Sequence, residues 1–498
     1  MLLEMAAAGG GDRIALGGRG AGLTYGALLD QARRVASLVA ATGAERLVVV
    51  DVNSDLLPAL LFGSGLAGVP FVPLNYRLSA LELRAVLARS APALAVVDPG
   101  VAARVGPVEG ITWHSRAELV DRLEGLDPAG PGETDPEGIA VLLHTSGTTG
   151  EPKAAVLRHR HLAAYVLATV GFMDAGPDDA ALVSVPPYHV AGVATILTSV
   201  YRGRRLVYQP QFDAEAWVDA ARDEAITHAL VVPTMLGRIL DVVERRGEKL
   251  GSLVHLAYGG GRMAVPVIER AMDLLPHVGF VNAYGLTETS STIAVLDPED
   301  HRAAFGSGDP AVRARLGSVG RPLPSVEVEI RDGAGHRRPA GDHGAVFVRG
   351  EQVSGEYLGR SVLTADGWFP TNDGGWLDDG GYLFIDGRLD DVIVRGAENL
   401  SPGEIEDALV AHPAVAQAGV FGVPDEEWGE AVAAAVVLEP GAVATVAELQ
   451  DWVRARLRSS RTPAVIGFAD HLPYTETGKL LRRVLKAELL EGRASPGG

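Results

Sequence analysis

The chain has 498 residues, of which 47% are hydrophobic and 21% charged, with a formal net charge of −19 and no cysteine. This length exceeds what one compact core usually holds, so we expect at least two domains, and the composition excludes a disordered chain. The acidic balance argues against a nucleic-acid or anionic-membrane surface, and the lack of cysteine excludes disulfides and a thiol nucleophile.

The first residues lack a basic segment followed by an apolar region, which argues against a secretory signal. No apolar run reaches the ~18–20 residues that a membrane-spanning helix needs. We therefore expect a cytoplasmic protein without a membrane span.

Helical and strand-like segments alternate from residue 24 to residue 99, and the strand pattern recurs between residues 228 and 285. Apolar strands separated by helices predict parallel sheets that are covered on both faces. We expect helices at Thr24–Thr42, at 56–68 and from an N-cap at Ser79, and strands at Arg46–Val52, 71–74, Ala93–Pro99, His228–Thr234, Leu253–Gly261 and Val278–Gly285.

The pattern changes near Ser325, where short alternating strands are joined by Gly- and Asp-rich turns. Such text predicts an antiparallel β-region. After Asp391 the mixture of helices and strands returns. We expect an α/β fold in which a large N-terminal domain, residues 1–389, is hinged to a small α+β C-terminal domain, residues 390–498.

The segment HTSGTTGEPK, His144–Lys153, follows a short apolar strand and is rich in hydroxyl groups and glycine. Glycines allow successive backbone N–H groups to converge on an anion, and hydroxyls and a lysine add donors and charge. This chemistry predicts a polyphosphate-binding loop; the alternative is an ordinary solvated loop. The hydroxyl donors are Thr145, Ser146, Thr148 and Thr149, the glycines are Gly147 and Gly150, and the cation is Lys153.

Lysine is rare in this chain. Only Lys153, Lys249, Lys479 and Lys486 occur among 44 basic residues, and the rest are arginine. Lys153 ends the loop above, and Lys479 lies in a second motif, TETGKLLRR. A lysine offers a compact point charge where arginine presents a planar fork. The usage favours a specific role for both residues over two ordinary surface lysines.

Three other patterns are interpreted without function. Gly63–Gly68 fits a dinucleotide-binding spacing but lies in helix-like text, which favours helix packing. Gly259–Ala264 follows a strand, but the next strand ends in Tyr284 and not in an acidic residue, which argues against NAD. His159 and His161 have no third ligand nearby in sequence, which argues against a metal site.

Several motifs follow the hydroxyl-rich loop in a fixed order: NAYGLTETSS, WFPTNDGG, YLFIDGRLDD, VRGAENLSPGEIE and TETGKLLRR. Together they resemble the adenylate-forming superfamily, which includes acyl-CoA synthetases, aryl-CoA ligases, luciferases and peptide-synthetase adenylation domains. The resemblance covers nearly the whole chain, and the acyl- and aryl-CoA ligase branch is the most similar.

The resemblance implies a reaction in two steps. A carboxylate attacks the α-phosphate of ATP and displaces pyrophosphate, and a thiol, coenzyme A, then attacks the acyl carbon and releases AMP. Charge gathers on phosphate oxygens, so donors and cations must already be in place. The resemblance implies ATP and Mg²⁺ as cofactors, coenzyme A as a substrate, and a rotation of the C-terminal domain about a hinge at Asp390 between the two steps.

The resemblance also implies the site residues. Tyr284 would stack on adenine, Asp373 would bind the ribose, and Lys479 would bridge the carboxylate and the α-phosphate. The implied catalytic residues are Lys479, Thr287, Glu288 and Arg388, with Glu288 and Thr148 at the metal. The implied ATP- and AMP-binding residues are Thr145, Ser146, Gly147, Thr148, Thr149, Gly150, Lys153, Gly259, Gly260, Gly261, Asn282, Ala283, Tyr284, Gly285, Asp373 and Arg388. The implied acyl pocket contains His189, Val190, Gly192, Tyr258, Gly259 and Leu286, and the implied CoA-binding segment contains Arg395, Gly396, Ala397 and Glu398.

Small residues in the implied pocket favour a hydrophobic carboxylic acid. Three positions depart from the family's usual residues: Asn372 and Ala397 replace glycines, and Arg262 stands where a small or apolar residue is common. Arg262 is interpreted as solvated, with a second substrate carboxylate as the alternative partner. Ala397 leaves open a specialised half-reaction enzyme that thiolates a preformed adenylate.

Other readings also stay open at this point. The acceptor could be the phosphopantetheine of a separate acyl carrier protein, and a luciferase-like monooxygenase or a non-catalytic AMP- or acyl-binding protein could share the fold. We expect a monomer or a homodimer.

Overall fold

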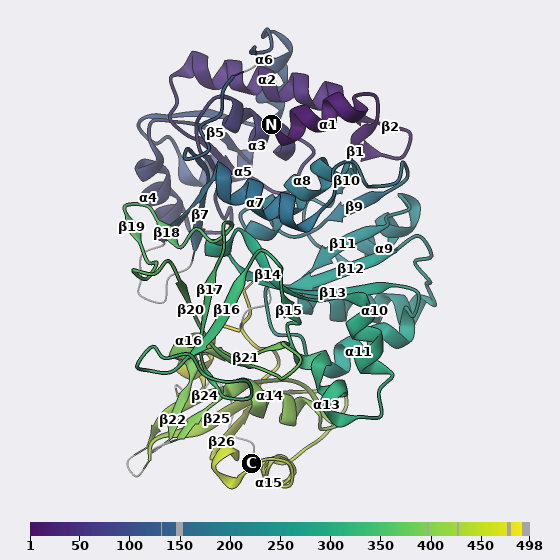
Figure 1. Ribbon diagram of the computed structural model, residues 1–498, viewed down its shortest axis with the longest axis vertical. Coiled ribbons are helices and arrows are strands. Elements are labelled where there is room, and N and C mark those ends of the chain that lie inside the picture. The colour runs from purple at the N-terminus through teal and green to yellow at the C-terminus, as the bar shows by residue number, and fades with distance from the viewer. Residues whose placement is uncertain (131, 146–152, 396–397, 426–427, 476–479, 491–498) are drawn as a thin grey trace.

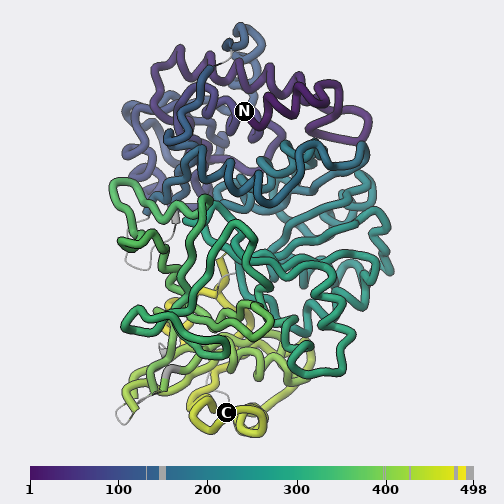
Figure 2. The backbone as a smooth tube through the Cα atoms, in the orientation of Figure 1, coloured from purple at the N-terminus to yellow at the C-terminus, as the bar shows by residue number. Residues whose placement is uncertain are grey.

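The computed structural model describes residues 1–130, 132–145, 153–395, 398–425, 428–475 and 480–490 (Figure 1). Two sheets built largely of parallel strands occupy the N-terminal part, an antiparallel sheet follows, and the C-terminal elements gather at the end of the molecule opposite α1 and α2. The backbone tube follows the same path from the purple N-terminal part to the yellow-green C-terminal part (Figure 2). The predicted α/β fold is confirmed.

The first sheet has the strand order β15-β14-β13-β12-β11-β9-β10-β1-β2. Its central strands are parallel, and β13 turns back into the antiparallel strand β14. The strands are β1 (Ile14–Gly18), β2 (Ala21–Thr24), β9 (Ala180–Val183), β10 (Arg205–Tyr208), β11 (His228–Val231), β12 (His255–Gly259), β13 (Gly279–Leu286), β14 (Ser291–Leu296) and β15 (Arg321–Pro322). The associated helices are α1 (Leu2–Gly10), α2 (Tyr25–Thr42), α8 (Val190–Arg202), α9 (Ala214–Asp223), α10 (Pro233–Arg246), α11 (Val265–Leu274), α12 (Pro298–Phe305) and α13 (Pro310–Arg313).

The second sheet has the order β19-β18-β8-β7-β4-β3-β5-β6. Its strands are β3 (Leu47–Val50), β4 (Phe71–Pro73), β5 (Ala93–Val97), β6 (Ile111–His114), β7 (Ile139–Thr145), β8 (Lys153–Arg158), β18 (Glu356–Tyr357) and β19 (Arg360–Ser361). Its helices are α3 (Leu57–Leu66), α4 (Ala80–Ser90), α5 (Pro99–Val105), α6 (Arg116–Glu124) and α7 (His159–Thr169). Because β18 and β19 come from late in the chain, this sheet brings residues 356–361 beside the β7–β8 hairpin.

Helix boundaries follow local signals that the sequence carries. The hydroxyl of Thr24 accepts a hydrogen bond from the backbone N–H of Ala27, and α2 ends at Gly43, which has a φ of 64°. Ser79 and Glu82 form a reciprocal capping box at the start of α4. Such caps satisfy backbone donors that the first turn leaves unpaired.

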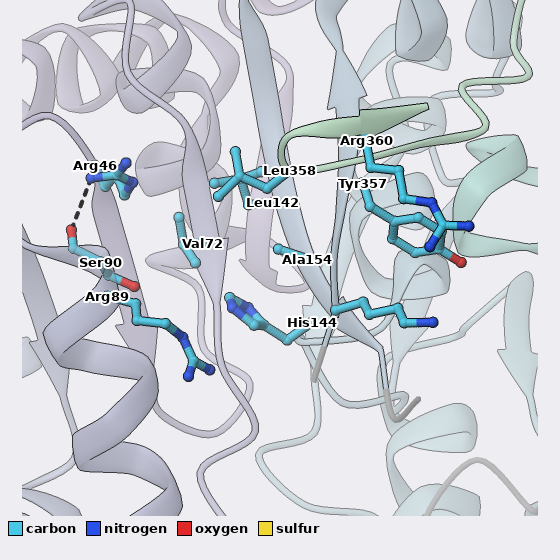
Figure 3. Close-up of a pocket in the computed structure, with 11 residues that line it drawn as sticks. Arg46, Val72, Arg89, Ser90, Leu142, His144, Ala154, Tyr357, Leu358 and Arg360 are labelled. Carbon is cyan, nitrogen blue, oxygen red and sulfur yellow. Dashed lines mark hydrogen bonds between the residues drawn. The ribbon is translucent and has the colours of Figure 1, made fainter. Parts of the chain in front are cut away.

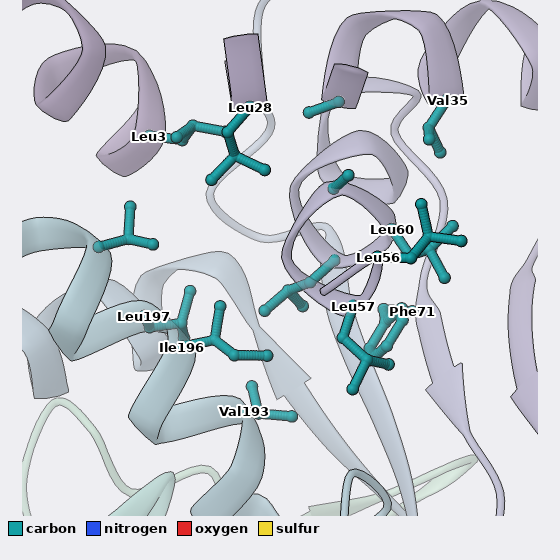
Figure 4. Close-up of a cluster of buried hydrophobic side chains, with 14 of the residues drawn as sticks. Leu3, Leu28, Val35, Leu56, Leu57, Leu60, Phe71, Val193, Ile196 and Leu197 are labelled. Atoms are coloured by element: carbon teal, nitrogen blue, oxygen red, sulfur yellow. The ribbon is translucent and has the colours of Figure 1, made fainter. Parts of the chain in front are cut away.

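One apolar core joins the two largely parallel sheets (Figure 4). Leu57 and Leu60 of α3 lie beside Phe71 of β4, and Val193 and Leu197 of α8 pack from the first sheet's side. Gly63 lets α3 approach α2 closely, since a Cβ at this position would lie 2.6 Å from Val35. The interpretation of Gly63–Gly68 as helix packing is confirmed for the N-terminal part of that segment, which lies inside α3.

The predicted antiparallel region is the third sheet, with the order β16-β17-β20-β21. Its strands are β16 (Glu327–Arg331), β17 (Gly344–Arg349), β20 (Phe369–Leu377) and β21 (Leu383–Arg388), and short 3-10 turns occur at η1 (Thr287–Thr289), η2 (Ala314–Gly317) and η3 (Leu389–Asp391). The chain leaves this sheet after Arg388 and enters the next at Ile393, so a change of sheet coincides with the expected domain boundary. The division into two domains stays a prediction.

The fourth sheet contains the path β23-β22-β25-β24, with β26 beside β25. Its strands are β22 (Ile393–Arg395), β23 (Glu398–Leu400), β24 (Val415–Asp425), β25 (Gly429–Leu438) and β26 (Val465–Phe468), and its helices are α14 (Pro402–Val410), α15 (Val446–Arg454) and α16 (Arg482–Leu490), with the 3-10 turn η4 (Ser459–Arg461). These elements enclose a core of their own. In the described part of the chain, no helix has the length and apolar character that crossing a bilayer would require.

Candidate active site

The hydroxyl-rich loop joins β7 to β8. These strands pair antiparallel, and their last register pair sets Thr145 opposite Lys153. The two residues therefore stand at the base of a hairpin. Ser146, Gly147, Thr148, Thr149 and Gly150 lie outside the described residues, so their predicted contacts with phosphate stay predictions.

Lys153 connects the hairpin to a tyrosine from the far end of the sequence. Its Nζ lies 5.8 Å from the centre of the Tyr357 ring. Tyr357 is on β18, opposite Ala155 of β8. The Tyr357 hydroxyl donates a hydrogen bond to Oε1 of Glu288. Burial, together with the Glu288 carboxylate, raises the pKa of Tyr357, so this hydroxyl stays protonated and remains a donor.

Glu288 lies in the turn η1, directly after the last residue of β13. Its side chain is buried, with 8% exposure. The backbone N–H groups of Ser354 and Gly355 donate to the Glu288 carbonyl oxygen at 2.9 and 3.1 Å. These bonds fix the turn from the segment that leads to Tyr357, so the backbone and the side chain of Glu288 are held by the same part of the chain.

The neighbouring strand ends are packed too closely for side chains. Gly259 of β12 pairs with Ala283 of β13. A Cβ at Gly259 would collide with the carbonyl oxygen of Ala283, and one at Gly285 would collide with that of Ser291. Gly260 has a φ of 79°, which favours glycine. The glycines keep backbone, and not side chain, at the carboxyl ends of these parallel strands, where ligands of open α/β sheets bind.

Asp373 joins Tyr284 and Arg388 in one polar cluster. The Tyr284 hydroxyl donates to Asp373 Oδ2 at 2.5 Å. Arg388 Nη1 lies 3.2 Å from Asp373 Oδ1 and donates to the Thr371 carbonyl oxygen at 2.7 Å. Asp373 and Arg388 are directly opposite on β20 and β21. Burial and the Asp373 carboxylate raise the pKa of Tyr284 well above its ordinary value.

Asn372 contacts the predicted hinge. It adopts a φ of 63°, a conformation that asparagine tolerates better than most residues. Its side-chain amide donates to Asp390 Oδ2 at 2.7 Å. Asp390 lies in η3, between the third and fourth sheets. The asparagine that replaces the family's glycine therefore ties the third sheet to the hinge residue.

Arg262 contacts the C-terminal elements. It follows the glycines after β12, and its guanidinium pairs with the Asp407 carboxylate of α14. The guanidinium lies over Gly403, where a Cβ would collide with it. Arg262 is thus paired within the chain, and its expected solvated position is wrong in this arrangement.

The residues of the implied acyl pocket lie in different environments. His189 precedes α8, its ring is 4.7 Å from that of Tyr188, and burial lowers its pKa to about 4. Gly192 lies close to the Pro186 carbonyl oxygen, 3.1 Å from where a Cβ would be. Tyr258 is fully buried, and its hydroxyl is 2.8 Å from Nε2 of His301. The Tyr258 side chain therefore packs in the core beside α12.

The implied CoA-binding segment is described in part. Arg395 donates to the Ser460 carbonyl oxygen at 2.8 Å and lies 5.4 Å from the centre of the Trp428 ring. Glu398 is exposed at the start of β23. Gly396, Ala397 and Lys479 lie outside the described residues.

The comparisons with known proteins follow from the whole chain. The sequence profile of AMP-binding enzymes matches residues 3–358, and that of the AMP-binding enzyme C-terminal domain matches residues 404–479. The chain belongs to the AMP-binding enzyme family. The resemblance stated from the motifs is therefore confirmed.

Relatives and solved structures of this AMP-binding enzyme match nearly end to end. A fatty acid–[acyl-carrier-protein] ligase from Streptomyces coeruleorubidus is 34% identical over 481 residues, which cover 93% of this chain and 91% of the relative. A feruloyl-CoA synthase from an Amycolatopsis species is 33% identical over 472 residues, 93% of each chain. O-succinylbenzoate coenzyme A synthetase from Bacillus subtilis, solved with ATP and a magnesium ion, has a TM-score of 0.81 and 28% identity, covering 97% of this chain and 99% of its own.

The AMP-binding enzyme also uses residues that the sequence reasoning missed. Tyr357 and Asp407 stood in no motif, and Trp428 was not named. Tyr357 belongs to a strand of two residues, too short for periodicity to mark. Asp407 lies on an amphipathic helix, where an acidic residue normally faces solvent. No local signal pointed to either contact.

Proposed function

We propose that the chain is an ATP-dependent acid–CoA ligase, which converts a hydrophobic carboxylic acid to an acyl-adenylate and then to an acyl-CoA thioester. The observation that carries the proposal is the gathering of Glu288, Tyr284, Asp373 and Arg388 at the strand ends. The end-to-end similarity to CoA ligases and synthetases supports it.

In the first step, the chain's own groups would bind and orient ATP. The proposed roles are those implied by the family: the residues from Thr145 to Gly150 and Lys153 for the outer phosphates, Thr287 for the α-phosphate, and Lys479 for the bridge between carboxylate and α-phosphate. Because negative charge develops on phosphate oxygens, fixed donors lower the barrier. The Asp373 carboxylate and the Arg388 guanidinium would hold the ribose.

Glu288 has the chemistry of a magnesium ligand. In the described residues, no group of three or more histidine, aspartate or glutamate side chains could enclose a metal. Mg²⁺ is commonly bound through one or two carboxylates together with substrate phosphates. A single buried carboxylate whose orientation is fixed by Tyr357 fits that use. Bound Mg²⁺ would neutralise charge on the phosphates.

In the second step, the C-terminal elements would rotate about Asp390 and present the segment Arg395–Glu398 to the thiol. The contact of Asn372 with Asp390 places this residue at a defined point between two sheets. A hinge needs few residues that absorb the backbone change, and η3 is short.

An acyl carrier protein is the second candidate acceptor. The Streptomyces relative is named for transfer to such a carrier. The two acceptors share the phosphopantetheine thiol, so the same tunnel would serve both. The cytoplasmic location and the oligomeric state stay predictions.

Exchange of labelled pyrophosphate into ATP with a panel of aliphatic and aromatic acids tests the first step. Addition of CoA or of a holo-carrier protein, with mass detection of the thioester, tests the second. We expect acid-dependent exchange and a CoA thioester. Absence of exchange with every acid, with AMP still bound, would favour a non-catalytic protein.

A further inference from the structure

A cationic cavity borders the proposed active site. It has a volume of about 320 Å³ and lies between α4, the β7–β8 hairpin and the β18–β19 strands. Arg46, Arg89, Lys153 and Arg360 line it, together with His144. No carboxylate is among the described residues that line it. Coulomb repulsion among these cations makes the empty arrangement unfavourable, and an anion would relieve it.

Arg89 and Arg360 lack ion-pair partners in the described part of the chain. This is unlike arginines nearby, since Arg158 of β8 pairs with Glu356 of β18 at 2.7 Å. In a protein of net charge −19, acidic partners are abundant. Two unpaired guanidinium groups at one cavity therefore mark a place where charge is left available.

The cavity floor is apolar and its inner side is fixed by backbone contacts. Val72, Leu142 and Ala154 line the floor. Arg46 donates to the Ser90 carbonyl oxygen at 3.3 Å. Figure 3 shows the His144 ring directed toward Arg89, while Tyr357 and Arg360 lie on the other side of the strands. The site is thus built from elements that other contacts already hold.

His144 is the neutral donor or acceptor of the cavity. Its Nδ1 is buried without a hydrogen-bond partner. Burial and the neighbouring Arg89 lower its pKa to about 4, so the ring is uncharged at neutral pH. A buried ring nitrogen without a partner is costly unless a ligand or water completes it.

Tyr357 and Lys153 are shared by the cavity and the proposed site. Tyr357 lines the cavity and donates to Glu288. Lys153 lines the same cavity and ends the phosphate-binding hairpin. A group that leaves the outer-phosphate position could therefore move along these two side chains without crossing an acidic surface.

We propose that this cavity is a phosphate subsite that receives the pyrophosphate released in the first step, with Arg89 and Arg360 as its ligands. The proposal rests on the proposed function. The 3′-phosphate of coenzyme A carries the same chemistry and is the other source of a phosphate group. The shared wall with Glu288 favours pyrophosphate.

The first measurement needs no turnover. Titration calorimetry with inorganic pyrophosphate compares the wild type with Arg89→Ala and Arg360→Ala. Each variant is expected to weaken binding by roughly five- to tenfold, the scale of one charge-assisted hydrogen bond. Arg89→Lys should recover part of the loss. Arg84→Ala is the matched control, because Arg84 is on the same helix but donates to the Val105 carbonyl oxygen outside the cavity.

The second measurement separates the two sources. In the exchange assay, the KM for pyrophosphate should rise in both variants while the KM for coenzyme A stays unchanged. A rise in the KM for coenzyme A, with none for dephospho-coenzyme A, would support the subsite with the 3′-phosphate as its occupant. If neither pyrophosphate binding nor either KM differs from that of Arg84→Ala, the proposal is overturned. If the wild type binds pyrophosphate through Arg89 but catalyses no exchange, the proposed function fails and the subsite stands.

Discussion

Arg262 and Asp407 form an ion pair that links the loop after β12 to helix α14. The two side chains are 42% and 43% exposed. Pairs this exposed typically contribute ~0–1 kcal/mol. The pair therefore favours the observed placement of α14 without preventing its departure, as a rotation about Asp390 would require.

Breaking this pair should change the balance between the two half-reactions. We expect Arg262→Ala to alter the ratio of adenylation to thioester formation by up to roughly fivefold, because ~1 kcal/mol of preference for one arrangement is lost. Pyrophosphate exchange reports the first step, and thioester formation from isolated acyl-adenylate reports the second. Arg262→Asp combined with Asp407→Arg should restore the ratio.

Arg270→Ala is the control for the Arg262 variant, since Arg270 forms a surface pair with Asp241 at 2.8 Å that stays within one sheet's helices. A ratio that shifts equally in the Arg262 and Arg270 variants would remove the link from the domain movement.

The Tyr357 hydroxyl should matter for the first step. Tyr357→Phe removes the donor to Glu288, and we expect adenylation to slow by roughly tenfold or more, the scale of a hydrogen bond to a charged group. The KM for Mg²⁺ should rise as well, because Glu288 loses its orientation. Tyr382→Phe is the matched control, since Tyr382 donates to Asp300 at 2.5 Å away from the site. An unchanged rate and Mg²⁺ dependence in Tyr357→Phe would rule out this role.

Lys479 should separate the half-reactions. Lys479→Ala is expected to slow adenylation by roughly 10²-fold, as does the loss of one transition-state donor. Thioester formation from a preformed adenylate should stay close to that of the wild type, because this lysine is assigned to the first step alone. Lys486→Ala, another of the four lysines, serves as the control. Normal adenylation in the Lys479 variant would refute the assignment.

Acid should destabilise the fold through His228. Burial, with Arg204 and His255 nearby, lowers the pKa of His228 to about 3. The unfolded chain takes up this proton near pH 6.5, and the folded chain resists it down to about 3. Stability from the neutral ring is therefore complete above pH 6.5 and is lost progressively as the pH falls toward 3.

The melting temperature, followed from pH 7.5 to pH 5, checks this sign. The wild type should lose roughly 2 °C more over this range than His228→Asn, which cannot titrate there. His336→Asn, at an exposed position, should behave like the wild type. Parallel loss in the wild type and His228→Asn would contradict the expectation.

Periodicity and caps predicted the fold well because the signals are local. Thr24 and Ser79 begin helices through their own side chains, and the apolar runs at Leu47–Val50 and Ala93–Val97 can be buried only inside a sheet. Gly259 and Gly285 are required by backbone contacts within paired strands, so glycine in those motifs carried structural information.

The contacts between distant segments could not be predicted in this way. Asp373 and Tyr284 are 89 residues apart, and Tyr357 and Glu288 are 69 apart. Nothing in either member of such a pair specifies its partner, because the geometry comes from how separate sheets are placed. The resemblance named Tyr284, Glu288 and Asp373 individually, and the bonds that hold them appeared only in three dimensions.

The shared core of α3 and α8 has a consequence for engineering. A hybrid enzyme cut between the first and second sheets would divide Leu57 and Phe71 from Val193 and Leu197, and would have to rebuild that packing with foreign side chains. A hybrid joined within η3 would inherit an intact N-terminal core and an intact C-terminal one. Exchange of the small lobe among relatives, with Arg262 and Asp407 transferred as a pair, is therefore the recombination that this architecture tolerates best.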